Sequence, residues 1–180
     1  VPEIARRYGM TVSLGIWISP DMEKNEQQIQ QGIRTALANR RTIDRVIVGN
    51  ETQLFGYVSP DQLNAYILRV RSALPARIKI TTAEPWSTWM LTPEVGKYAD
   101  VIFVHLLPYW ENVDIRASLQ STEKFYNHIQ GEFPDKQIVV GEAGWPSEGR
   151  THGRAEASAA NEGWFIRGFV QFAQEKGWDY

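Results

Sequence analysis

The chain has 180 residues and contains no cysteine. This absence excludes disulfide bonds, a thiolate nucleophile and cysteine-ligated metal sites. Neither sign of charge predominates, because 19 Lys and Arg residues face 21 Asp and Glu residues and give a net charge of −2. Nucleic-acid binders usually carry a clustered basic excess, so the composition argues against that class of partner. No apolar run approaches the roughly 18–20 residues that cross a bilayer, so we expect no direct membrane contact by this segment.

The sequence also lacks the Gly-rich phosphate-binding signatures GxGxxG and GxxxxGK[ST], which argues against an open nucleotide-binding sheet. Short β-branched runs are present instead, and each is nearly continuously apolar at its centre. Such runs are typical of parallel strands covered on both faces. They predict five strands, at residues 11–18, 45–49, 77–82, 100–106 and 137–141.

Helical patterns separate these strands. The clearest helix start has Ser59 as N-cap, Pro60 at the first helical position and Gln62 completing a capping box. The helical period predicts further helices at residues 22–39, 114–131 and 154–176, and a single short turn at 92–98. The alternation of strands and helices is typical of βα units with a parallel sheet.

Polar and aromatic residues gather just past the ends of successive predicted strands, as in a (β/α)₈ TIM barrel. The barrel is therefore the predicted fold class, and residues 1–180 are expected to be a single catalytic-domain portion. A complete barrel takes about 250 residues, so we expect an incomplete one, with the final GWDY beginning a further strand. Because an isolated five-strand piece would expose two sheet edges, we expect this piece alone to be poorly soluble and inactive.

Two glutamates follow buried strands directly, Glu51 in VIVGNE and Glu142 in IVVGEAGWPS. Cleavage of a glycosidic bond needs one carboxylic acid that protonates the leaving oxygen, and one carboxylate that attacks or directs water. Two glutamates on non-adjacent strand ends of one barrel can face each other across its mouth. The pair therefore predicts a glycosidase site with no metal and no cofactor.

The combination of VGNE with GE-x-GWPS about ninety residues later resembles glycoside hydrolase family 17, the β-1,3-glucanase family. The resemblance implies that Glu51 is the general acid/base, that Glu142 is the nucleophile and that Asn50 binds the sugar 2-hydroxyl. It also implies that strands three to seven and the start of the eighth are present, and that β-glucan is the partner. HLLPYWEN looks more like bacterial members, some of which resemble transglycosylases attached to membrane synthases. We expect an extracytoplasmic location, and attachment to a larger membrane protein stays open.

Further residues at the predicted strand ends are candidates for substrate binding. Glu84 follows a strand in TTAEPW, and sugar binding, tuning of a neighbouring pKa and pairing with arginine all stay open for it. His105 is more typical of a structural, hydrogen-bonded residue. Sugars stack on flat aromatic rings beside convergent polar groups. The remaining substrate-binding candidates are Trp86, Tyr109, Trp110, Glu111 and Trp145.

Three interpretations of function follow. The first is a retaining β-1,3-glucan hydrolase or glucanosyltransferase, and the sequence leaves hydrolysis and transfer open. The second is a non-catalytic β-glucan-binding module that keeps the aromatic cleft. The third, and least favoured, is a metal-dependent barrel enzyme with Glu51, Glu84 and Glu142 as hard-cation ligands.

Overall fold

The structure is a computed structural model that describes all 180 residues. Its one sheet has five strands in the order β1-β2-β3-β4-β5, which is the order of the sequence. The strands are β1 (Val12–Ile16), β2 (Ile43–Asn50), β3 (Lys79–Pro85), β4 (Val101–Leu106) and β5 (Gln137–Ala143). β1 pairs with β2 and β2 with β3, both in parallel. Sequential order is that of a (β/α)₈ barrel, whereas a doubly wound sheet reverses its order at a switch point.

All five predicted strands are present, but three of them extend past their predicted ends, β2 by a single residue to Asn50. β3 continues to Pro85 and β5 to Ala143, so Glu84 and Glu142 lie inside strands and not after them. Glycine, proline and alanine flank Glu84 and Glu142, and these residues are depleted in strands, so the local sequence does not indicate the longer strands. The ends of strands are the least certain part of a sequence-based assignment.

Helices lie in the connections between successive strands. They are α1 (Pro2–Arg7), α2 (Met22–Ala38), α3 (Pro60–Ala73), α4 (Trp86–Leu91), α5 (Ser118–Glu132) and α6 (Ala159–Lys176), with 3₁₀ helices η1 (Pro93–Tyr98) and η2 (Ile115–Ala117). The predicted cap of α3 is confirmed, since the hydroxyl of Ser59 accepts a hydrogen bond from the Gln62 N–H at 3.2 Å. Helix α4 was not predicted, and the last helix begins five residues later than predicted.

The chain divides into two compact units. Unit 1 comprises residues 1–84 and 91–102, and unit 2 comprises residues 85–90 and 103–180. Strand β4 begins in unit 1 and continues in unit 2. Each unit carries one of the two predicted catalytic glutamates.

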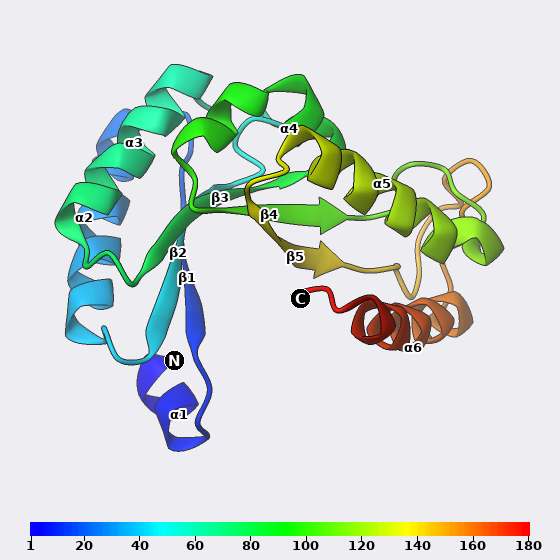
Figure 1. The fold of residues 1–180 in the computed structure, drawn as a ribbon. Coiled ribbons are helices and arrows are strands. Elements are labelled where there is room, and N and C mark those ends of the chain that lie inside the picture. Colours follow the sequence, from blue (N-terminus) through cyan, green and yellow to red (C-terminus); the bar gives the residue numbers. More distant parts are fainter. The chain divides into compact units, whose positions relative to one another are not determined.

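In unit 1, α2 and α3 pack side by side along β1 and β2 (Figure 1). The apolar residues of these helices face the strands because they recur at the helical period. The fully buried core side chains of unit 1 include Ile18, Ile29, Val46, Val48, Leu63, Ile67 and Val70. This packing fixes the end of β2, from which the Glu51 loop departs.

In unit 2, α5 and α6 contact each other, and both are amphipathic helices whose buried residues include Ile129 and Phe165. The end of the chain pairs with β5: the Val140 N–H donates to the Asp179 carbonyl at 2.8 Å, within a parallel bridge of Val139 and Asp179. The predicted start of a further strand after the last helix is therefore confirmed as a bridge.

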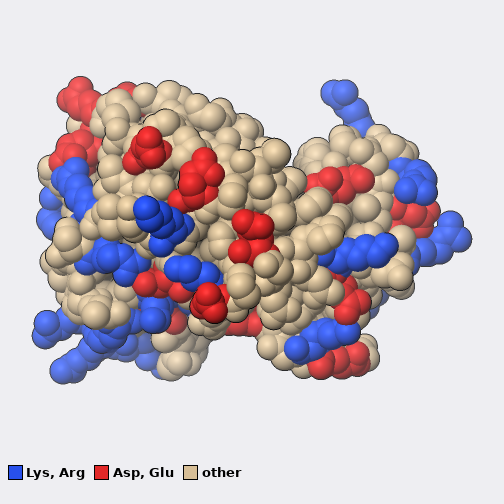
Figure 2. All heavy atoms as spheres, turned by 45° about the horizontal axis from the view of Figure 1, so that its top comes forward, with Lys and Arg blue, Asp and Glu red and all other residues tan.

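Acidic and basic side chains intermix over much of the face shown in Figure 2, in keeping with the near-balance of charge in the sequence. None of the helices combines the length and the apolar character that a membrane crossing requires.

Candidate active site

Glu51 is the first residue after β2, and its backbone is unusual. Its φ is +53°, in the left-handed region that non-glycine residues rarely adopt. Gly49, two residues earlier, has φ +85°, and a Cβ at that position would lie 2.3 Å from the Thr52 hydroxyl oxygen. Backbone strain of this kind persists only where the surroundings over-determine it, and it clusters at functional sites. The chain therefore makes a sharp, specified turn at the predicted acid/base.

Glu84 of β3 contacts the backbone of the loop that follows this turn. Its side chain is fully buried, at 0% exposure. Its two carboxylate oxygens accept hydrogen bonds from the backbone N–H groups of Gln53 and Leu54, at 2.7 and 3.2 Å. Of the possibilities left open by the sequence, sugar binding and pairing with arginine are not what this side chain does here. Glu84 binds the backbone of the Glu51 loop.

Burial raises the pKa of Glu84 to about 7, while the hydrogen bonds from the Gln53 and Leu54 backbones oppose that rise and the nearby Glu51 carboxylate adds to it.

Asn50 ends β2 and pairs in register with Ala83 of β3. It lines a hollow of about 210 Å³ in unit 1, together with Trp17, Ile16 and Ile47. Trp17 is more than half exposed. Asn50 thus lies next to Glu51 in the sequence and beside an accessible hollow.

Glu142 lies in β5 of unit 2, and its side chain is 51% exposed. The preceding residue, Gly141, packs against the Phe103 ring so closely that an added Cβ would lie 2.0 Å from a ring carbon. His105 of β4 is fully buried, and its Nε2 lies 3.5 Å from Oε1 of Glu142. A side chain in place of the first glycine of GE-x-GWPS would clash with Phe103, which explains the glycine at this position. His105 contacts the predicted nucleophile from the neighbouring strand.

Trp145 and Tyr109 are packed side chains. Trp145 is 4% exposed, and its indole N–H donates to the Glu156 carbonyl at 2.8 Å. The Tyr109 ring meets the Trp145 ring edge-on at 5.5 Å, and its hydroxyl donates to the Arg150 carbonyl. Both side chains hold the loop after β5 in place. This burial favours a supporting role over the sugar stacking that the sequence suggested for Trp145.

Trp110 is 62% exposed and offers far more ring surface than Trp145. It lines a mainly apolar hollow of about 540 Å³ in unit 2, with Tyr109, Pro146, Glu148, Gly149, Arg150 and His152. An aromatic wall with a few polar groups is typical of carbohydrate and other small-ligand sites. Among the predicted aromatic candidates, Trp110 has the geometry of a stacking platform.

Trp86 and Glu111 are brought together in unit 2, since the indole N–H of Trp86 donates to Oε1 of Glu111 at 3.0 Å. The Trp86 ring also stacks on Phe125, with ring centroids 4.5 Å apart and planes within 5°. The two predicted substrate-binding residues thus form a contact with each other, which orients both.

Sequence reasoning did not single out the apolar tip of the Glu51 loop. Leu54 and Phe55 are both exposed there, Phe55 at 58%, and the Phe55 ring stacks on Tyr57 with centroids 5.4 Å apart. A signal was available, because adjacent apolar residues in a loop directly after a predicted acid/base have no core to fill.

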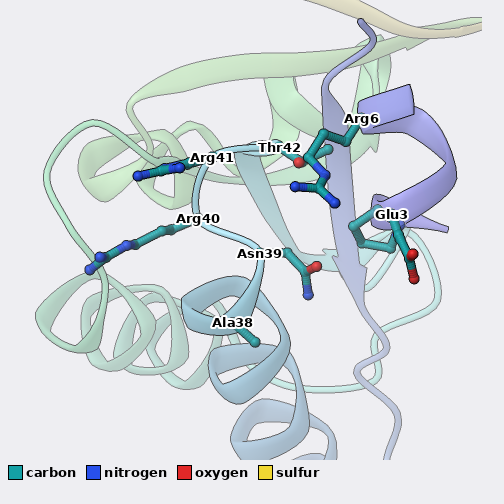
Figure 3. Close-up of a pocket in the computed structure, with 8 residues that line it drawn as sticks. Glu3, Arg6, Ala38, Asn39, Arg40, Arg41 and Thr42 are labelled. Atoms are coloured by element: carbon teal, nitrogen blue, oxygen red, sulfur yellow. The ribbon is translucent and has the colours of Figure 1, made fainter. Parts of the chain in front are cut away.

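A separate pocket of about 400 Å³ lies between α1 and the turn that leads from α2 into β2 (Figure 3). Arg40 and Arg41 extend from that turn, and Arg6 approaches from α1. This pocket lies at the amino-terminal end of β2, and barrel enzymes place their chemistry at the carboxyl ends of their strands. It contains none of the predicted site residues.

A family model described as the BtgE/BtgC glycoside hydrolase domain matches residues 1–180. The chain is 26% identical to "Probable beta-glucosidase btgE" of Neosartorya fischeri, over 95% of this chain and 32% of that protein. It is also 26% identical to "Glucan 1,3-beta-glucosidase" of Arthroderma benhamiae, over 87% of this chain and 54% of that protein. These relatives are fungal and give no support to the predicted bacterial resemblance.

Two solved structures of a Rhizomucor miehei β-1,3-glucanosyltransferase are similar to this chain, each with a TM-score of 0.88 over 98% of this chain and 66% of that chain. Their sequence identities are 26% for an active-site mutant in complex with laminaritriose and 27% for a structure described as glycoside hydrolase family 17. The match confirms the predicted fold class, a five-stranded part of a (β/α)₈ barrel.

The chain spans about a third of the btgE relative and 66% of the solved glucanosyltransferase. Over that span the family model, the curated relatives and the solved structures all match the chain to enzymes that act on glycosidic bonds. The chain therefore belongs to the BtgE/BtgC glycoside hydrolase domain family, as the resemblance to glycoside hydrolase family 17 predicted.

Proposed function

We propose that this domain cleaves or transfers β-1,3-glucan chains by a retaining, double-displacement reaction. The observation that carries the proposal is the placement of two glutamates at the carboxyl ends of parallel strands. Glu51 directly follows β2, and Glu142 is the next-to-last residue of β5. Membership of the glycoside hydrolase family supports it. The laminaritriose bound to the similar Rhizomucor miehei enzyme supports the choice of β-1,3-glucan.

In the first step, a carboxylate oxygen of Glu142 attacks the anomeric carbon while Glu51 gives its proton to the departing glycosidic oxygen. The bond from that carbon to the leaving sugar breaks, and a glycosyl ester of Glu142 forms. In the second step, Glu51 takes a proton from water or from a sugar hydroxyl, whose oxygen then displaces Glu142. Water gives hydrolysis, and a sugar hydroxyl gives transfer.

The remaining predicted residues have supporting parts in this proposal. Asn50 binds the 2-hydroxyl, an interaction that strengthens in the transition state. Trp110 stacks on a sugar ring beside the unit 2 hollow, and the contact of Trp86 with Glu111 orients both side chains toward substrate. His105 keeps the Glu142 carboxylate in one orientation through their 3.5 Å contact. We also propose an extracytoplasmic location, where β-glucan is accessible.

The direct test uses the full-length protein with linear β-1,3-gluco-oligosaccharides and mass spectrometry of the products. Shorter products indicate hydrolysis, and products longer than the substrate indicate transfer. Binding without any product would select the glucan-binding module instead. Retention requires the two carboxyl groups to lie about 5–5.5 Å apart in a substrate complex, whereas a separation of roughly 6.5–9.5 Å would indicate inversion.

A further inference from the structure

The turn that carries Glu51 is bonded to the end of β3. Three successive residues of that strand each bond to the end of β2 or to the loop that follows it. The Thr82 hydroxyl donates to the Gly49 carbonyl at 3.1 Å, and the Ala83 carbonyl accepts the Glu51 N–H at 2.8 Å. Glu84 accepts the N–H groups of Gln53 and Leu54.

Glu84 differs from the other two residues in the kind of contact that it makes. Thr82 and Ala83 bond to the residues at and before the turn, as neighbouring strands ordinarily do. The Glu84 carboxylate instead reaches past the strand end, to a part of the loop with no backbone partner in β3. The Glu84 carboxyl group therefore bonds to two loop N–H groups that the backbone of β3 does not reach.

The cost of this arrangement indicates that it is specified. A fully buried carboxylate is expensive unless hydrogen bonds compensate for its lost hydration, and Glu84 is 0% exposed. Glu51, two residues before the first of the loop residues that Glu84 binds, is held at φ +53°. A buried carboxyl group and a strained backbone therefore occur in the same turn.

We propose that Glu84 is a positioning residue: its two hydrogen bonds to the Gln53 and Leu54 backbones fix the turn at Glu51, and so aim the Glu51 carboxyl group at the glycosidic oxygen. The loop then closes on itself, because the Phe55 N–H donates to the Glu51 carbonyl at 3.1 Å and the Tyr57 N–H donates to the Thr52 carbonyl at 3.0 Å. This inference rests on the proposed function, in which Glu51 is the acid/base.

The first test separates aim from general stability by the choice of leaving group. A β-1,3-glucan oligosaccharide needs a proton from Glu51 to release its leaving sugar. A dinitrophenyl β-laminaribioside releases dinitrophenolate without that proton. Misplacing a catalytic group by about 1 Å costs on the order of 100-fold. In the full-length protein, Glu84→Gln should therefore lower kcat/KM about 100-fold on the oligosaccharide, and less than about threefold on the dinitrophenyl substrate.

Asp100→Asn is the matched control. Asp100 also accepts a backbone N–H, that of Ile80 at 2.7 Å, but at the amino-terminal end of β3 and not at the loop. This variant should leave the ratio of the two kcat/KM values unchanged. Glu84→Asp keeps the charge on a shorter side chain and should fall between the wild type and Glu84→Gln in that ratio. Equal losses on both substrates, or no loss on either, would overturn the positioning role.

A second test needs no turnover. Hydrogen exchange of at least one of the Gln53 and Leu54 amides should quicken about tenfold or more in Glu84→Gln, because the glutamine side chain has one acceptor oxygen where the carboxyl group has two. Both amides should stay at the wild-type rate in Asp100→Asn. Unchanged exchange would overturn the inference even in an active enzyme. A wild-type protein that turns over neither substrate would refute the proposed function instead, and the exchange result would still decide whether Glu84 holds the loop.

Discussion

The two predicted catalytic glutamates are held in different ways. Glu51 sits in a left-handed turn outside the sheet, and hydrogen bonds from β3 and the Glu84 carboxylate restrain it. Glu142 sits in regular strand backbone, and the close packing of Gly141 on Phe103 restrains it. The first arrangement depends on polar partners that can be removed, and the second depends on space that can be filled. Different substitutions should therefore break each one.

The largest expected effect comes from removing the nucleophile itself. Glu142→Gln keeps the shape of the side chain but cannot form the glycosyl ester, so kcat/KM on β-1,3-gluco-oligosaccharides should fall by about 10⁴-fold or more. Glu132→Gln, at the exposed end of α5, is the matched control and should keep wild-type activity. Wild-type-like turnover in Glu142→Gln would remove Glu142 from the proposed mechanism.

The next prediction concerns Glu84, which restrains the Glu51 loop, and the pH dependence of folding stability that it causes. The folded state raises the pKa of Glu84 from 4.5 to about 7, so the folded protein binds this proton more tightly than the unfolded chain does. The associated stability is complete below about pH 4.5 and is lost as pH rises through about 7. Each pKa unit corresponds to about 1.4 kcal/mol, so the loss over the full range is about 3.5 kcal/mol, most of it between pH 5 and 8. Chemical denaturation between pH 5 and 8 measures it.

Glu84→Gln supplies the comparison for that measurement, since glutamine does not titrate. The fall in the free energy of unfolding between pH 5 and 8 should be smaller in this variant by most of that amount. Parallel pH profiles for the wild type and Glu84→Gln would show that the buried carboxylate has an ordinary pKa.

Gly141→Ala tests the steric restraint at Glu142. The new Cβ would lie 2.0 Å from the Phe103 ring, so β5 or the ring must move, at a cost of about 2–3 kcal/mol. Because the displaced residue precedes Glu142, activity should fall as well. The double variant Gly141→Ala with Phe103→Leu should recover part of both losses. Gly131→Ala, where an added Cβ meets nothing within 4 Å, should not destabilise the fold.

The smallest effect concerns the turn before Glu51. Gly49→Ala places a side chain at φ +85° and 2.3 Å from the Thr52 hydroxyl oxygen, which should cost about 1–2 kcal/mol of folding free energy. Gly15→Ala is the control, because its Cβ meets nothing within 4 Å and its φ is not positive. Equal thermal unfolding midpoints for the two variants would mean that the turn relaxes freely.

Local patterns in the sequence were enough to predict much of this protein. The five strands, the N-cap at Ser59 and the bridge near Asp179 all follow from short runs of residues. The sequence did less well at α4, where Trp86–Leu91 has too few residues for a helical period to be distinguished from a loop. The sequence also predicted that Glu142 follows the strand, whereas it lies inside β5. Nothing local marks where pairing with a neighbouring strand stops.

The sequence by itself determined the alternation of strands and helices, the two glutamate motifs and the family to which they belong. Each of these depends on residues that are close together in the chain. The tertiary structure alone decided that Glu84 binds a loop some thirty residues earlier, that His105 contacts Glu142 and that Trp145 is buried while Trp110 is exposed. Burial and hydrogen bonding at those positions come from partners distant in sequence, so they exist only once the sheet has brought the strands together.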